Sequence, residues 1–410
     1  MTFGPFGLGH LDGKAIMVPN AVAGDRLEVA IEAERRDYSL AKIREIVRAS
    51  PERRTAPCAY LPRCGGCDWQ HIEYAAQVRF KSEMIARELN HALDAAIDSA
   101  ELVTPAPAEF GYRSRIRLKV GPKGMLGFHE ANSNAIVQID SCMVAEPNIR
   151  MPLHLARSLG KHVEEIEVVR GESDAREVQV AFLKKPADAE DMRRARNVLE
   201  ADRSIAGIVL RSGARRETIG ETVVSIELEK GLAVEVDADL FSQVNRAQNQ
   251  KLVATVMAMA EIHEATPLLD LFCGAGNFSL PAARRGARVT GVDAEAGAVA
   301  AASSNALRLG FKDAQFVAMK ASQTAEFLHR ARYRPEVVIL DPPRTGALDL
   351  MAPIIKLKPR VIAYVSCDVT TLARDLRHLL RAGYKLSSVR GFDFFPNTHH
   401  VEIAAQVLLT

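Results

Sequence analysis

The sequence predicts an α/β protein in three parts, on the basis of three observations. Residues 1–50 alternate apolar and polar positions, three cysteines cluster just after them, and five short apolar segments recur within residues 237–410. We therefore expect a small β unit over 1–50, a mixed α+β domain over 51–236 and a doubly wound α/β domain over 237–410. A chain of 410 residues can build two or three such cores.

The N-terminal unit is predicted to be all-β. Its segments KAIMVPNAV, DRLEVAIEAER and YSLAKIREIV alternate in polarity and are separated by Gly and Asp. Short strands punctuated in this way are typical of an OB-type barrel.

The composition is that of an ordinary globular protein: 48% of the residues are hydrophobic, 25% are charged, and the formal net charge is +2. This weak positive charge permits a nucleic-acid partner but does not by itself indicate one. The first residues, MTFGPFGLGHLDGK, lack the basic and apolar regions of a signal peptide. No stretch approaches the roughly 18 apolar residues of a membrane span. We therefore expect a cytoplasmic monomer without a membrane partner.

Three of the six cysteines lie within ten residues, in CAYLPRCGGC. A cytoplasmic chain of this size has little need of disulfides, so the spacing predicts metal ligation by Cys58, Cys64 and Cys67 rather than a chance cluster of thiols. A tetrahedral site needs a fourth ligand, which the local sequence leaves open. The other three cysteines are scattered along the chain: Cys142, Cys273 and Cys367.

The middle of the chain mixes helices and strands. The stretch AAQVRFKSEMIARELNHAL has apolar residues at helical spacing and ends at TPAPAEF, and this excursion over about 77–108 is expected to pack on the C-terminal domain. In YRSRIRLKV, cations occupy every second position: Arg113, Arg115, Arg117 and Lys119. On a strand they share one face, which would either follow RNA phosphates or simply be solvated.

The C-terminal domain is predicted from the segments PLLDLF, ARVTGVD, AQFVAM, EVVILDPP and RVIAYVSC. Short apolar runs that alternate with stretches of helical length indicate parallel strands buried on both faces. Ligands of such sheets bind outside the carboxyl ends of the strands. The residues that follow each strand are therefore the candidates for a functional site.

The first of these strands runs into a glycine turn, DLFCGAGNFSL, and a helix is expected from near Phe278. Gly274 and Gly276 allow the backbone to approach a ligand closely. Asp293, which ends the second strand, can bind the two hydroxyls of a ribose, and this suits NAD and S-adenosylmethionine equally. Ser279 occupies the third glycine position of the dinucleotide fingerprint, which disfavours NAD. A plain tight turn is the alternative.

Three further reactive side chains are expected at strand ends. Asp341 follows the fourth strand on a rigid Pro-Pro turn in DPPRTG. Cys367 follows the fifth strand in YVSCDVTTLARDL, just before a helix expected to start near 368–370, and the partial positive charge of that helix start should lower the pKa of the thiol. Glu402 opens the last strand in FPNTHHVE. Cys273, inside the glycine turn, is interpreted as an inert buried residue.

In their order along the chain, these segments resemble the RNA uracil-C5 methyltransferases, which make 5-methyluridine in 23S ribosomal RNA and in tRNA. DLFCGAGNFSL, DPPRTG, SCDVTTLARDL and FPNTHHVE are similar to that family's cofactor, substrate and catalytic motifs. CGGCDWQHIEYAAQVRFK is similar to its iron–sulfur segment, and residues 4–48 resemble its TRAM domain, an RNA-binding β-barrel. Several motifs in the right order are far more specific than any one of them.

The resemblance implies a Rossmann-like domain that binds S-adenosylmethionine and a central domain that holds a [4Fe–4S] cluster. It also implies that Cys367 is the nucleophile and Glu402 the general base. The implied contacts of S-adenosylmethionine are Gln243, Phe272, Asn277, Asp293 and Asp341. The implied cluster ligands are Cys58, Cys64, Cys67 and Cys142. Zinc with His71 as its fourth ligand is the alternative, because thiolate-rich sites suit either metal.

The implied reaction is methylation of uridine C5 in RNA, with 23S ribosomal RNA favoured over tRNA. Uracil C5 attacks a methyl sulfonium only after a thiolate has added to C6, and a base must then remove the C5 proton so that the thiolate can leave. A catalytically silent RNA-binding or assembly factor is an alternative, because Asp368 and Val369 stand where the family has Asn-Pro. Lys320 likewise replaces an acidic residue. A dehydrogenase would have no use for Cys367 and Glu402.

Overall fold

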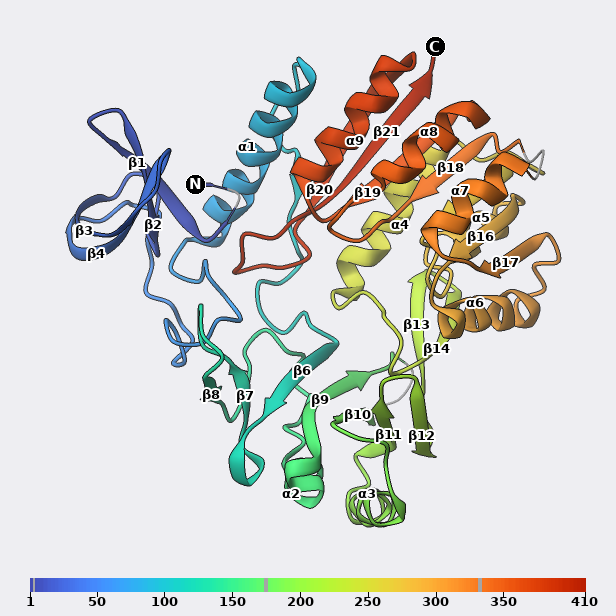
Figure 1. Ribbon diagram of the computed structural model, residues 1–410, viewed down its shortest axis with the longest axis horizontal. Coiled ribbons are helices and arrows are strands. Elements are labelled where there is room, and N and C mark those ends of the chain that lie inside the picture. The colour runs from blue at the N-terminus through green and yellow to red at the C-terminus, as the bar shows by residue number, and fades with distance from the viewer. Residues whose placement is uncertain (3, 173–175, 331–333) are drawn as a thin grey trace.

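The structure is a computed structural model that describes the chain except for residues 3, 173–175 and 331–333 (Figure 1). The helices are α1 (Tyr74–Leu93), α2 (Leu153–Leu159), α3 (Ala189–Ala201), α4 (Arg246–Ala260), α5 (Ser279–Arg284), α6 (Ala296–Arg308), α7 (Ala321–Arg330), α8 (Leu348–Leu357) and α9 (Val369–Arg381). Among these described helices, none combines the length and the apolar character needed to cross a membrane.

The strands of the N-terminal half are β1 (Phe6–Leu11), β2 (Lys14–Pro19), β3 (Arg26–Glu34), β4 (Tyr38–Arg48), β5 (Val103–Thr104), β6 (Arg115–Val120), β7 (Leu126–His129), β8 (Ile136–Gln138), β9 (Val163–Arg170) and β10 (Glu177–Leu183). Those of the C-terminal half are β11 (Ile205–Ser212), β12 (Arg215–Gly220), β13 (Val223–Glu229), β14 (Leu232–Asp237), β15 (Pro267–Leu271), β16 (Arg288–Asp293), β17 (Ala314–Ala318), β18 (Val337–Leu340), β19 (Val361–Ser366), β20 (Tyr384–Phe392) and β21 (Glu402–Leu409).

The first four strands form a sheet of their own. They pair in the order β1-β2-β4-β3, with β2 and β4 parallel and the other pairs antiparallel. Because alternate residues of a strand share one face, Ile16, Val18 and Ala41 lie together and form a small core. Val22, just after β2, packs against Trp69 of the cysteine segment and so joins this sheet to the rest of the molecule.

A seven-stranded sheet forms the centre of the molecule, in the order β12-β11-β10-β9-β6-β7-β8. Helices α2 and α3 pack on one face, where Leu155 and Ala195 share a core with Ile166. The other face carries Val180, which packs with Val224 and neighbouring residues of the β13–β14 hairpin. This hairpin also contacts α4 and α6, so it connects the central sheet to the C-terminal domain (Figure 1).

The C-terminal domain is built on an eight-stranded sheet in the order β17-β16-β15-β18-β19-β21-β20-β5. The five predicted strands are present as the parallel strands β15 to β19, and β21 pairs antiparallel to β19. Helices cover both faces, because α8 and α9 pack on one side and α4 and α5 on the other. The strand order reverses between β15 and β18, which is where ligands of such sheets bind.

Helix α1 leaves the cysteine segment and packs on this C-terminal domain. Ile85 and Leu89 share a core with Leu372 and Leu376 of α9, and Figure 1 shows the two helices side by side. Directly after the excursion, β5 adds a parallel strand to the edge formed by β20. The predicted contact of the 77–108 excursion with the α/β domain is thus present.

Side chains of α1 hold the loop between β20 and β21, residues 393–401, through hydrogen bonds. Lys81 Nζ donates to Asp393 Oδ1 at 2.6 Å and to the Phe395 carbonyl at 3.1 Å, and both charged side chains are fully buried. Gln77 Nε2 donates to Asn397 Oδ1 at 3.2 Å, while the Asn397 N–H donates back to Gln77 Oε1 at 2.8 Å. A buried charge is stable only with its partner in place. Residues of α1 therefore fix a loop that lies more than 300 positions further along the chain.

We expect Lys81→Met to lower the free energy of unfolding by about 3–5 kcal/mol, because it leaves the Asp393 carboxylate buried without a partner. Arg79→Met is the matched control, since Arg79 lies on the same helix and its half-exposed side chain forms surface ion pairs with Glu52 and Glu83. Loss of such a surface pair costs about 1 kcal/mol or less. Urea unfolding followed by the fluorescence of Trp69, the single tryptophan, measures both. Equal costs in the two variants would contradict the role given to the buried pair.

Candidate active site and cysteine pocket

A pocket of about 310 Å³ lies at the carboxyl edge of the eight-stranded sheet, beside the reversal of strand order. Every residue that was predicted to contact a cofactor lines this one pocket: Gln243, Phe272, Asn277, Asp293 and Asp341. Phe272, Asp293 and Asp341 follow or end three neighbouring parallel strands. The topology therefore brings together residues that are distant in sequence.

The glycine turn after β15 shapes one wall of the pocket. Phe272, Gly274 and Gly276 all have positive φ angles, of 66°, 53° and 96°. A Cβ atom at Gly276 would lie 2.7 Å from Leu280, so a side chain there would force the helix α5 away. The Gly274 N–H donates to Asp293 Oδ2 at 2.8 Å, which ties the turn to the end of β16.

The sequence analysis missed two polar contacts behind this wall. Asn249 of α4 exchanges two hydrogen bonds with Asn277, at 2.8 and 3.1 Å, and so fixes the amide that borders the pocket. Ser279, at the third glycine position, donates from Oγ to the buried Asp270 at 2.5 Å. Burial raises the pKa of Asp270 to about 7. A single acid inside the apolar segment PLLDLF was the signal that could have revealed it.

The β13–β14 hairpin closes the pocket on another side with the apolar residues Ile226, Leu228, Val234 and Val236. Their alternation along two strands was visible in the sequence, but it could not show which sheet they would pack on. An apolar wall opposite the polar strand ends is typical of pockets for organic cofactors.

Cys367 and Glu402 face each other beside this pocket. Their strands are antiparallel neighbours with Ser366 opposite Ile403, so the register makes the next residues, Cys367 and Glu402, a cross-strand pair. The predicted positions are therefore both present: Cys367 precedes α9, and Glu402 is the first residue of β21. Cys367 is half-buried, whereas Glu402 is only 7% exposed.

The predicted lowering of the pKa of Cys367 is wrong for the protein alone. Burial raises the pKa of this thiol to about 11, and the carboxyl groups of Glu402 and Asp341 add to the effect. Arg344 acts in the opposite direction. A helix start contributes a fraction of a charge, which is too little to outweigh burial and two nearby acids.

Glu402 itself is shifted for the same reasons. Burial raises the pKa of Glu402 to about 8, with Asp341 adding to the shift and Arg344 opposing it. Burial also raises the pKa of Asp341 to about 7, with a contribution from Asp293. Several acids thus share one poorly solvated strand edge, and such clustering of perturbed pKa values is common at catalytic sites.

Asp368, one departure from the family pattern, is the N-cap residue of α9. Its carboxylate caps α9 by accepting a hydrogen bond from the Thr371 N–H at 2.9 Å. This interaction directs the Asp368 charge to the helix start, where it is stabilised. Lys320, the other departure, is exposed, and among the described residues it does not line the pocket.

The interpretation of the cationic stripe as a phosphate-binding face is wrong. Strand β9 lies beside β6, and its Glu165 and Glu167 match the spacing of the cations. Arg115 Nε lies 2.9 Å from Glu167, Arg117 Nη2 lies 3.0 Å from Glu167, and Lys119 pairs with Glu165. The glutamates at every second position in VEEIEVV were the signal that could have predicted this neutralisation.

Arg115 serves instead to hold the segment that leads to Gln243. It is 6% exposed and donates to the carbonyls of Ala238 and Leu240, at 3.1 and 2.8 Å, and to Ser242 Oγ at 3.0 Å. The central sheet therefore positions one edge of the pocket.

A second, smaller pocket of about 90 Å³ lies between the cysteine segment and the central sheet. All four cysteines of the predicted cluster line it: Cys58, Cys64, Cys67 and Cys142. The segment is held there because the Gly65 N–H donates to the His129 carbonyl at 2.9 Å, next to the β7–β8 hairpin. Burial raises the pKa of Cys67 to about 11 and also raises that of Cys142.

The spacing of these thiols bears on which metal they suit. A single tetrahedral zinc ion, with Zn–S bonds of about 2.3 Å, would hold the four sulfurs roughly 3.8 Å apart. Within the described part of the chain, the one group of three potential ligands lying within 4.8 Å of each other is elsewhere. His71, the fourth ligand of the zinc alternative, lines a neighbouring pocket together with Cys64 and Cys67. The four cysteines that line the smaller pocket are a thiol set that suits either an iron–sulfur cluster or zinc.

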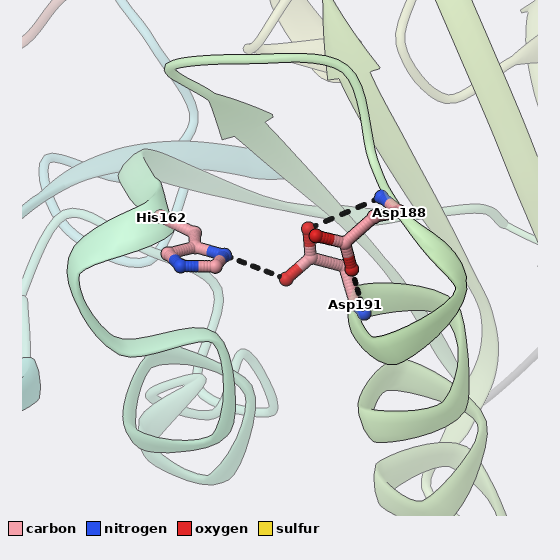
Figure 2. Close-up of side chains that lie close together, drawn as sticks. All are labelled: His162, Asp188 and Asp191. Atoms are coloured by element: carbon pink, nitrogen blue, oxygen red, sulfur yellow. Dashed lines mark hydrogen bonds and ion pairs between the residues drawn. The ribbon is translucent and has the colours of Figure 1, made fainter.

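The compact group of potential ligands is His162 with Asp188 and Asp191 (Figure 2). Asp188 and Asp191 form a capping box at the start of α3, in which each carboxylate accepts the other's backbone N–H. His162 Nδ1 lies 2.9 Å from Asp191 Oδ1. These oxygens are already used by hydrogen bonds, so the group is a helix cap and not a metal site.

The cysteine segment also contacts the 393–401 loop directly. The N–H groups of Asp68 and Trp69 donate to the Asn397 carbonyl at 3.1 and 3.0 Å. Asp68 in turn accepts from the His399 N–H at 3.0 Å and lies 2.5 Å from His399 Nδ1. A residue adjacent to Cys67 therefore helps to hold the loop that leads to Glu402.

Comparison with known proteins identifies the family. A family model described as tRNA (Uracil-5-)-methyltransferase matches residues 133–410. A protein of Pectobacterium atrosepticum named 23S rRNA (uracil(1939)-C(5))-methyltransferase RlmD is 32% identical over 98% of this chain and 91% of its own length. The protein of the same name from Cronobacter sakazakii is 33% identical over 97% of this chain and 92% of its own length.

A solved structure shares the fold. The tRNA (uracil-54, C5)-methyltransferase of Pyrococcus abyssi, in complex with S-adenosyl-L-homocysteine, superposes with a TM-score of 0.73 at 24% identity and covers 97% of each chain. The matched length, the relatives and the site geometry agree. The chain belongs to the RNA uracil-C5 methyltransferase family.

Proposed function

We propose that this protein uses S-adenosylmethionine to methylate uridine C5 in 23S ribosomal RNA. The observation that carries the proposal is the pairing of Cys367 with Glu402 beside the larger pocket. Asp341, which lines this pocket, raises the pKa of both residues. The two relatives with 23S rRNA in their names support this choice of RNA, because they are similar over nearly the whole chain. A tRNA substrate is the second candidate, which the name of the family model favours.

The pocket residues support a role in holding the cofactor. Asp293 can bind the ribose hydroxyls, the glycine turn lets the backbone approach, and Asn277 is pre-positioned by Asn249. When bound, S-adenosylmethionine supplies the methyl group as a sulfonium. The apolar hairpin and Phe272 exclude water from the same space, which keeps the charges at this edge poorly screened.

Cys367 acts first in the proposed mechanism. The thiol releases its proton to solvent, and the resulting thiolate adds to C6 of the uracil. C5 thereby becomes nucleophilic and forms a bond to the methyl carbon as the sulfur–methyl bond breaks. Glu402, with its pKa of about 8, is protonated at neutral pH and so leaves the thiolate as the single negative charge of the pair. The raised pKa of Glu402 therefore favours the first step.

Glu402 acts second. Once the thiolate has become a thioether it carries no charge, so one cause of repulsion is gone and Glu402 ionises more readily. Its carboxylate removes the C5 proton, the electron pair forms the C5–C6 double bond, and the C6–S bond breaks to restore the thiolate. The two members of one coupled pair are thus used in sequence.

The remaining parts are proposed to serve RNA binding and cohesion. A [4Fe–4S] cluster would be held by Cys58, Cys64, Cys67 and Cys142. Its role there would be structural, because it would cross-link the segment before α1 to the central sheet. The N-terminal four-stranded sheet would act as a TRAM-type RNA-binding unit. Its strand order and its position beside α1 are compatible with that role.

The proposal is tested with RNA carrying tritium at uridine C5. The protein with S-adenosylmethionine should release tritium to water from 23S ribosomal RNA fragments, because the C5 hydrogen leaves during turnover. Release from tRNA instead would favour the second candidate. Absence of release from either RNA would contradict the enzyme and favour a silent RNA-binding factor.

The two catalytic roles predict opposite behaviour of two variants. Cys367→Ala should bind RNA and cofactor but form no adduct and transfer no methyl group. Glu402→Gln should add and methylate, then stall as a covalent protein–RNA adduct, since loss of a general base slows its step by about 10²- to 10⁴-fold. Denaturing gels resolve the adduct. Normal turnover by either variant would show that the roles are assigned wrongly.

The raised pKa of Glu402 predicts how the second step depends on pH. In the free protein this base is mostly protonated below about pH 8, and in the adduct, where Cys367 is an uncharged thioether, its pKa should be lower. The carboxylate that accepts the C5 proton should therefore become available as the pH rises towards 8. Decay of the adduct, isolated from its formation by rapid quenching, should therefore speed up as the pH rises from 6 to 8 and level off above it. In Glu402→Gln this pH dependence should vanish. A decay rate of the wild-type adduct that is flat over this range would contradict the assignment.

The cysteine pocket makes a prediction about metal content. Protein purified without oxygen should carry about four irons per chain, and Cys142→Ser should lose them although Cys142 lies far from the other ligands in sequence. Cys273→Ser is the matched control, because Cys273 lies in the glycine turn and should leave iron unchanged. Stoichiometric zinc in the wild type, or full iron in Cys142→Ser, would overturn the assignment.

A further inference from the structure

Arg113 is a half-buried cation that the proposed reaction does not use. Its backbone is fixed beside the fourth cysteine, since the Arg113 N–H donates to the Val144 carbonyl and the Glu146 N–H donates to the Arg113 carbonyl, both at 2.9 Å. Its side chain lines the cysteine pocket. The Nε atom is buried there and has no hydrogen-bond partner among the described residues.

The surroundings of Arg113 lack a carboxylate. In the described part of the chain no Asp or Glu lies within ion-pair distance of it, in contrast to Arg115, Arg117 and Lys119 of the following strand β6. The groups whose charges act on it are the thiols of Cys67 and Cys142 and the hydroxyl of Tyr112. A partly buried cation without a carboxylate partner is costly, so its natural partner is an anion held by those thiols.

The other side of Arg113 faces the 393–401 loop. Its guanidinium lies 5.6 Å from the ring centre of Phe395 and 5.7 Å from that of Tyr112, within the range of cation–π attraction. The Tyr112 hydroxyl donates to the Pro396 carbonyl at 3.1 Å. Arg113 therefore lies between the cysteine pocket and the start of the segment that carries Glu402.

We propose that Arg113 is the charge partner of an anionic cluster in the cysteine pocket and a positioning residue that joins this cluster to the 393–401 loop. The inference rests on the cluster given above as part of the proposed function. Four thiolates give an iron–sulfur cluster a net negative charge, and a fixed cation with a free N–H stabilises its more reduced state. When the cluster is lost, Arg113 loses its partner and Phe395 loses a fixed neighbour.

A solvated or RNA-binding role would not account for the Nε atom of Arg113, which is buried and has no hydrogen-bond partner among the described residues. A purely packing role remains distinguishable from a charge role, because a neutral side chain of similar length would preserve packing and remove only the charge.

The test compares Arg113→Met and Arg113→Lys with the wild-type full-length protein, purified without oxygen. Arg63→Met is the matched control, since Arg63 precedes the ligand Cys64 but its side chain is 71% exposed. The readouts are iron content, the rate of iron loss to a chelator and the midpoint potential of the cluster. None of these depends on methyl transfer.

Arg113→Met should lose iron faster, and at a fixed potential its ratio of reduced to oxidised cluster should fall by about tenfold, a shift of about 59 mV for one electron. Arg113→Lys should restore most of the wild-type behaviour, and Arg63→Met should match the wild type. If Arg113→Met is folded but lacks iron, recovery of iron in Arg113→Lys supports the proposal and its continued absence contradicts it. If Arg113→Met does not fold, Arg113→Gln replaces it.

Wild-type potential and iron retention in Arg113→Met would overturn the role of Arg113 and leave the cluster intact. Absence of iron from the wild type would overturn both the cluster and this inference. The tritium assay tests the proposed activity separately, because it measures methyl transfer by the wild type and does not use the Arg113 variants.

Discussion

The buried ion pair between Lys81 and Asp393 is the interaction on which the assembly of the site depends. It fixes the start of the 393–401 loop, and Asn397 fixes the middle by engaging Gln77, Asp68 and Trp69. One continuous stretch, residues 68–81, thus holds a loop that lies more than 300 positions further along the chain. Because β21 begins directly after this loop, its position decides whether Glu402 faces Cys367.

The second constraint is the low solvent exposure of the carboxyl edge of the eight-stranded sheet. Cys367, Glu402 and Asp341 share one poorly hydrated region, so their titrations are coupled, and each ionisation discourages the next. This arrangement suits a reaction that needs one negative charge at a time. In the proposed mechanism the thiolate is used in the first step, and the carboxylate is needed only after the thiolate has been consumed.

Sequence alone could predict the parts of the molecule that follow from local pattern. The parallel strands, the glycine turn, the start of α9 and the position of Glu402 came from periodicity and turn chemistry, and the family resemblance supplied the pairing of Cys142 with the distant cysteines. Partners across strands could not be predicted this way. Glu167 neutralises Arg115 and Glu165 neutralises Lys119 through a register that appears only in the folded sheet. The pKa of Cys367 likewise depends on burial and on neighbours from other strands.

The central claim is that this protein makes 5-methyluridine in 23S ribosomal RNA. The most direct test is to delete its gene in the source organism and map 5-methyluridine in ribosomal and transfer RNA by mass spectrometry. The account predicts loss of 5-methyluridine at one position of 23S ribosomal RNA, with tRNA unchanged, and recovery with the wild-type gene but not with Cys367→Ala. An unchanged 23S ribosomal RNA in the deletion strain would contradict it.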